Sequence, residues 1–92
     1  MDLQEYRTQL DKIDDAIVSL FIERMAISGQ IALYKKERGL PALDAKREKE
    51  KLADIGDKAG EEFRSYAYTL YATLADLSRA YQERILNNEP AL

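Results

Sequence analysis

The clearest pattern in the chain is an apolar stripe that begins near the N-terminus. Its members recur mostly at spacings of three and four residues: Leu3, Tyr6, Leu10, Ile13, Ile17, Leu20, Ile27, Ile31 and Tyr34. This spacing is typical of one long helix with a heptad seam. Asp2 and Glu5 form a capping box at its start, and Gly39 followed by Pro41 marks its end. The pattern predicts a helix over residues 3–38.

A second, shorter helix is expected after the proline. Asp44 suits its N-cap, and the helix is expected to run through Leu52 to about Ile55. Gly56 and Gly60 bracket the break that should follow.

A third helix is expected from near Glu61 to Asn87 and Asn88, before Pro90. Its apolar stripe consists of Phe63, Tyr66, Leu70, Leu74, Leu77, Tyr81 and Ile85. No internal repeat, low-complexity segment or linker interrupts the chain. The sequence therefore predicts a single all-α domain of three helices over residues 1–92.

The length of the first helix predicts association. At the usual rise per residue, a helix over residues 3–38 is about 54 Å long. A compact chain of this size has a radius of gyration of only about 12 Å. The helix therefore extends beyond the body of its own chain, and its apolar residues need a cover. We expect an intertwined helical homodimer with this helix at its centre.

Composition narrows the available chemistry. The chain has no Cys and no His, which excludes disulfides, thiolate nucleophiles and imidazole ligands. Carboxylate-only metal sites stay open, but no metal-ligand set is predicted. The apolar runs are short, and Asp2 and Glu5 do not suit a signal peptide. We expect a cytoplasmic protein without a membrane span.

Charge is distributed unevenly. The net charge is −3, which argues against a nucleic-acid partner. Residues 34–51 nevertheless hold seven basic and four acidic side chains. Both a solvated surface and a local anion site are consistent with this segment.

Three basic residues on the first predicted helix are candidates for binding an anion. Arg24 occupies the seam position between Leu20 and Ile27, where an unpaired charge is costly. It either extends its charged end to solvent, specifies the register of a dimer, or meets a carboxylate inside the bundle. Lys35 lies about 16 Å further along nearly the same face, and is either a helix-end cation or a second group on one small anion. Arg7 lies about 25 Å before Arg24, so it is a surface residue unless an antiparallel second copy brings it beside that copy's later turns.

Polar residues on the other two helices complete the candidate set. Ser78 and Gln82 stand where the third stripe should continue with apolar residues. They are either a polar boundary pair or part of a site. Asp44, Arg47 and Glu48 crowd the first turn of the second helix, where acidic residues are also ordinary helix chemistry.

Taken together, these positions match the motif of a known family. The motif residues are Arg7, Leu10, Ile13, Asp14, Glu23, Arg24, Met25, Lys35, Asp44, Arg47, Glu48, Ser78 and Gln82. In order, spacing and helix placement, the chain resembles the all-helical chorismate mutases over nearly its full length, in a stand-alone, monofunctional form. The resemblance implies a dimer of three-helix chains with two sites, each of which takes one arginine from the other subunit.

The resemblance also implies a reaction. Chorismate would rearrange to prephenate in an intramolecular Claisen-type step of aromatic amino-acid biosynthesis. Such a step requires no nucleophile, metal or cofactor. It requires a compact substrate conformer and stabilisation of charge on the breaking ether oxygen.

Roles for single residues follow from the same resemblance. Arg24 and the partner's Arg7 would bind the two carboxylates of chorismate. Lys35 and Gln82 would donate to the ether oxygen, and Glu48 would accept from the ring hydroxyl. The catalytic set is therefore Lys35, Gln82, Arg24 and Glu48.

The remaining three positions would support the substrate. Ser78 and Asp44 would do so at its carboxylate and hydroxyl ends, and Arg47 would line the wall near them.

Two alternatives stay open. A relative with the same fold, isochorismate-pyruvate lyase, uses a similar cationic site. A non-catalytic helical dimerisation module would explain the seam, although it leaves Arg24 and the matched polar set without a role.

Overall fold

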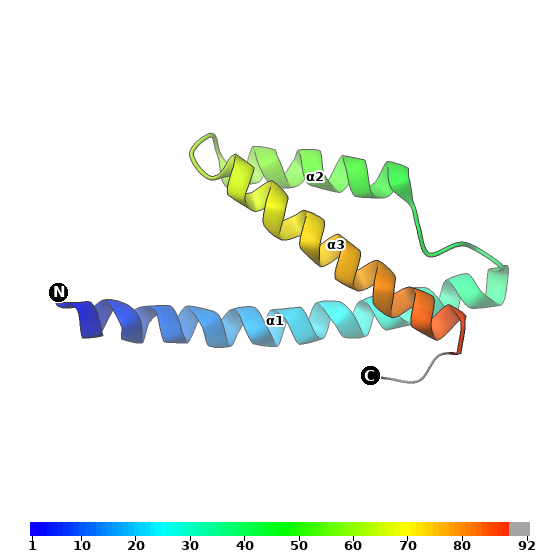
Figure 1. Cartoon of the computed structure of the whole chain (residues 1–92), viewed down its shortest axis with the longest axis horizontal. Coiled ribbons are helices and arrows are strands. Elements are labelled where there is room, and N and C mark those ends of the chain that lie inside the picture. The colour runs from blue at the N-terminus through cyan, green and yellow to red at the C-terminus, as the bar shows by residue number, and fades with distance from the viewer. Residues whose placement is uncertain (89–92) are drawn as a thin grey trace.

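The chain folds into three helices and the turns between them. A computed structural model describes residues 1–88. The helices are α1 (Leu3–Arg38), α2 (Ala45–Ala59) and α3 (Arg64–Leu86), and no strand occurs in that part of the chain. The predicted all-α class is therefore confirmed (Figure 1).

The bounds of α1 agree with the sequence prediction because both ends carry local capping signals. The Asp2 carboxylate accepts from the Glu5 amide at 2.9 Å. Gly39 closes the helix in the left-handed region, at a φ of 66°, and the Leu40 amide donates to the carbonyl of Lys35 at 2.9 Å. The expected stop signal at Pro90, beyond α3, lies outside the described residues.

Two helix boundaries differ from the prediction. The second helix does not stop at Ile55 but continues through Gly56 to Ala59. Gly56 is buried against α3, and a Cβ built there would lie 2.5 Å from the hydroxyl of Tyr68. The glycine therefore serves a close helix contact, and the chain breaks only at Gly60, which has a φ of 81°.

The third helix begins at Arg64 rather than near Glu61. Residues 61–63 form a turn, and Phe63 takes the N-cap position without a side-chain capping bond. The first expected member of the apolar stripe thus lies just outside the helix.

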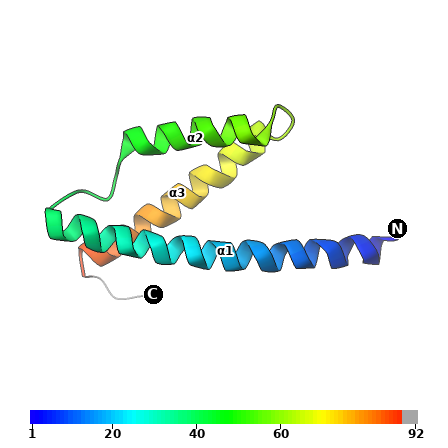
Figure 2. The ribbon, with the colours of Figure 1, turned by 180° about the vertical axis from the view of Figure 1, so that it is seen from behind.

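The helices form an open wedge. α3 packs against both α1 and α2, whereas α1 and α2 do not approach each other closely in the described chain. The C-terminal end of α3 meets the C-terminal part of α1, and α3 diverges from α1 toward its own N-terminus, where it meets α2. The first turns of α1 project beyond the other helices (Figures 1 and 2). The molecule measures 54 × 29 × 16 Å, and its radius of gyration is 16.3 Å.

This shape leaves a very small core. Among the described apolar side chains, only those of Ala32 and Ile55 are buried. Leu10, Ile17 and Leu20 on α1 are each more than half exposed, as are many of their neighbours along the seam. A wedge of this kind exposes far more apolar surface than a stable monomer of this size normally does.

One observation on α1 departs from the expectation of no membrane span. The helix contains a stretch with a mean hydropathy of 1.5, which by length and composition alone is apolar enough to cross a bilayer. The core helix of a soluble protein passes the same test. The feature is therefore weak evidence for a membrane segment.

Candidate active site

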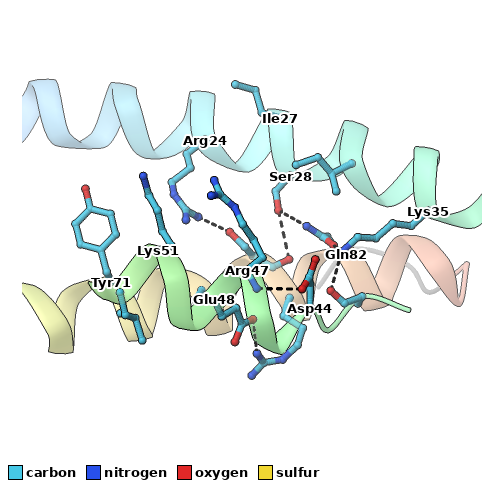
Figure 3. A pocket seen from close by; sticks show the side chains of 16 residues that line it. Arg24, Ile27, Ser28, Lys35, Asp44, Arg47, Glu48, Lys51, Tyr71 and Gln82 are labelled. Atoms are coloured by element: carbon cyan, nitrogen blue, oxygen red, sulfur yellow. Dashed lines mark hydrogen bonds and ion pairs between the residues drawn. The ribbon is translucent and has the colours of Figure 1, made fainter. Parts of the chain in front are cut away.

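Residues from all three helices line a cavity of about 410 Å³ that is open to solvent on one side. It is lined by seven of the eight residues singled out from the sequence: Arg24, Lys35, Asp44, Arg47, Glu48, Ser78 and Gln82. Those that Figure 3 labels, all except Ser78, lie on the three helices or at the N-cap of α2, and their side chains converge on one space. The fold thus brings together residues that lie up to 58 positions apart in the chain.

Arg24 crosses from α1 to α3. Its Nη1 donates to the hydroxyl of Ser78 at 2.5 Å, and both side chains are half-buried. A hydroxyl accepts a hydrogen bond without neutralising the guanidinium. The charge in the seam therefore has a polar partner but retains the capacity to bind an anion.

Lys35 on α1 and Gln82 on α3 are hydrogen-bonded to each other across the cavity wall. The Lys35 ammonium donates to the Ala42 carbonyl at 2.8 Å and to Gln82 Oε1 at 3.1 Å. Gln82 is only 7% exposed, and its Nε2 donates to the hydroxyl of Ser28 at 3.0 Å. Lysine has three N–H donors and a glutamine amide has two, so each keeps one for a ligand once these bonds are counted.

Ser28 was not among the candidates from the sequence. It is 4% exposed, accepts from Gln82 and donates to the backbone carbonyl of Ser78 at 3.5 Å. The Lys35 ammonium only donates, so the Gln82 atom that faces it is the oxygen, and the nitrogen of the amide faces the Ser28 hydroxyl, which accepts from it. The available signal was its position one helical turn after Arg24, on the same face.

Glu48 on α2 is paired with a residue that the sequence analysis also missed. Arg79 Nη1 lies 2.8 Å from Glu48 Oε1, and Arg79 Nη2 lies 2.8 Å from Asp76 Oδ1. Hydrogen bonds from the guanidinium to Asp76 and to Glu48 raise the pKa of Arg79 above its ordinary value. The Arg79 and Glu48 side chains are 27% and 32% exposed, so solvent limits the stability that the pair supplies to about 1 kcal/mol or less.

The first turn of α2 supplies the remaining predicted residues. Asp44 accepts from the Arg47 amide at 3.0 Å, which confirms it as the N-cap and leaves its other carboxylate oxygen available. The Arg47 side chain is exposed and lies over the cavity (Figure 3). Lys51, one turn later, also lines the cavity, and its Nζ forms an ion pair with Oδ2 of Asp54 at 3.6 Å.

The cavity is strongly cationic. Five cationic side chains line it, against only the two carboxylates of Asp44 and Glu48. The chain as a whole carries a net charge of −3, so this excess is local. A small polyanion is the class of ligand that such a lining favours.

Arg7 is the one predicted residue that does not reach this cavity. It is exposed near the start of α1 and is not part of the lining. Its distance along the helix axis from Arg24, about 25 Å, is the physical reason. In residues 1–88 no group of three or more His, Cys, Asp or Glu side chains is placed to hold a metal ion.

The sequence was also compared with models of known protein families. The family model of chorismate mutase type II matches residues 6–83, a span that includes all eight predicted site residues. The chain belongs to the chorismate mutase type II family.

Two further comparisons gave no match for this family member. No curated protein and no solved structure is significantly similar to the chain.

Substitution of Ser28 tests the buried hydrogen bonds that link Ser28, Gln82 and the Ser78 carbonyl. Ser28→Ala should lower the free energy of unfolding by about 1 to 3 kcal/mol, because a buried N–H of Gln82 loses its acceptor. Chemical denaturation measures the change. Ser65→Ala on the exposed first turn of α3 is the matched control and should be neutral. Equal stabilities for the two variants would contradict the network.

Proposed function

We propose that this protein is a chorismate mutase that converts chorismate to prephenate in the cytoplasmic synthesis of aromatic amino acids. The observation that carries the proposal is the cationic cavity, in which seven residues of the family motif converge. Membership of the chorismate mutase type II family supports the same activity.

The reaction suits a site without a nucleophile. One C–O bond of the ether breaks while one C–C bond forms within the same molecule, so no group is transferred to the protein. A million-fold acceleration requires a reduction of the barrier by about 8 kcal/mol. Fixing a compact conformer and aiming preformed donors at the developing charge can supply this amount.

Lys35 and Gln82 are the proposed donors to the ether oxygen. Their mutual hydrogen bond of 3.1 Å holds the two polar heads together at one end of the cavity. Each retains one N–H beyond the bonds made within the described chain. Two donors that are already oriented need little reorganisation when charge develops on the oxygen.

Arg24 is the proposed anchor of one substrate carboxylate, and the partner's Arg7 is proposed for the other. A second copy is supported by the exposed seam of α1. A mostly apolar groove of about 470 Å³ also opens between α1 and α3, beside Arg24. A helix of the second copy that filled this groove antiparallel to α1 would carry its Arg7 toward the cavity.

Glu48 is proposed to accept a hydrogen bond from the ring hydroxyl, with Asp44 and Ser78 as supporting polar groups and Arg47 over the cavity. The free oxygen of Glu48 and that of Asp44 are acceptors suited to a hydroxyl.

The deciding experiment follows the ultraviolet absorbance of chorismate with and without the protein, with identification of the product. We expect prephenate. Isochorismate is tested in parallel, and pyruvate released from it without any turnover of chorismate would favour the lyase. Failure to convert either compound would favour a non-catalytic dimerisation module.

Replacing an amide donor with a carboxyl should make activity depend on pH. A carboxyl donates only when protonated, and an ordinary glutamic acid is ionised above a pKa of about 4.3. Activity of Gln82→Glu should therefore rise as the pH is lowered, while that of the unmodified protein stays comparatively flat because an amide does not titrate. Gln82→Met is the control and should be poor at every pH. Parallel profiles for Gln82→Glu and the unmodified protein would remove Gln82 from the mechanism.

Mixing two inactive variants tests the shared site. Arg7→Ala and Arg24→Ala should each be inactive alone. A heterodimer would contain one intact site and one doubly altered site, so a random equimolar mixture should recover about a quarter of full activity. Co-purification of differently tagged subunits verifies exchange. Exchange without any recovered activity would refute the contribution of Arg7 across the interface.

A further inference from the structure

Arg79 links the wall of the cavity to a carboxylate that lies outside it. Its guanidinium donates to Glu48 on α2 and to Asp76 on its own helix, each at 2.8 Å. Glu48 and Arg79 line the cavity, but Asp76 does not. Asp76 therefore binds the guanidinium of Arg79 from outside the cavity, and the same guanidinium binds Glu48 in the cavity wall.

This arrangement leaves one oxygen of Glu48 for a ligand. An ionised carboxylate only accepts hydrogen bonds, and Arg79 occupies Oε1. In the described chain no hydrogen bond or ion pair reaches Oε2. Because guanidinium is a rigid planar fork bound at two points, it restricts the rotation of the carboxylate as a flexible ammonium would not.

We propose that Arg79 is a positioning residue for Glu48, an inference that rests on the proposed function. It holds the carboxylate so that Oε2 faces the ring hydroxyl of chorismate. The same contact favours a substrate that bears this hydroxyl, because an analogue without it leaves Oε2 with no donor. Arg79 itself does not touch the substrate.

A purely structural link between α2 and α3 is the alternative role. Both side chains are partly open to solvent, which weakens the contribution of such a pair to stability. The two roles are therefore separable, since positioning changes catalysis while leaving the melting temperature nearly unchanged.

The first test removes the guanidinium. Arg79→Met should lower kcat/KM for chorismate by about ten-fold to a hundred-fold, the usual effect of misplacing a contact group. Arg79→Lys should recover part of this loss, because an ammonium keeps the charge but not the fork. Lys58→Met is the matched control, since it breaks a 2.9 Å ion pair with Asp54 and Lys58 does not line the cavity. Its kcat/KM should be unchanged.

The second test asks whether Arg79 acts through Glu48. In a Glu48→Ala background, Arg79→Met should cause no further loss, because the carboxylate to be positioned is gone. With a chorismate analogue that carries hydrogen in place of the ring hydroxyl, Arg79→Met and the unmodified protein should react at equal rates.

The outcomes separate this inference from the function on which it rests. An active unmodified protein whose Arg79→Met loss is the same in the Glu48→Ala background, or with the analogue, would overturn the positioning role alone. If the unmodified protein forms no prephenate, the proposed function fails and the positioning role fails with it.

Discussion

The position of α3 is the constraint on which the rest of the structure depends. It packs on both α1 and α2, which do not approach each other closely in the described chain. Each of these contacts includes a glycine beneath a tyrosine. Gly56 lies under Tyr68 on the α2 side, and a Cβ on Gly29 of α1 would lie 3.1 Å from the ring of Tyr81. These two close approaches set the separation of α1 and α2, and hence the width of the cavity between them.

Inside that cavity, the polar groups are arranged so that each buried donor has an acceptor while cationic groups stay available. Gln82 and Ser28 are buried and hydrogen-bonded to each other, Gln82 keeps one N–H for a ligand, and in the described chain no deeply buried polar side-chain atom lacks a partner. Arg24 and Lys35 bond to neutral oxygens rather than to carboxylates. The bundle therefore tolerates these cations without neutralising them, which is the condition for binding an anionic substrate.

Sequence reasoning succeeded where the signal is local. The caps of α1 and the N-cap of α2 depend on residues a few positions apart, so both starts and the first stop were predictable. The continuation of α2 through Gly56 was not, because it depends on Tyr68 from another helix. Seven site residues were found because they match, in order and spacing, the motif of a known family, and because Arg24, Ser78 and Gln82 interrupt apolar stripes. Arg79 was missed because a charged residue on a helix is ordinary until its partner on the facing helix is known.

Arg24 and Tyr71 line both the polar cavity and the apolar groove between α1 and α3. If a second copy occupies the groove as proposed, then assembly and ligand capture share these two side chains. Thermodynamic linkage then makes the effect reciprocal, so that whatever factor assembly adds to the affinity for the ligand, the ligand adds to the affinity between subunits. A higher substrate concentration would then stabilise the dimer. Dilution of the protein would dissociate the subunits and, at the same time, lower their affinity for the ligand.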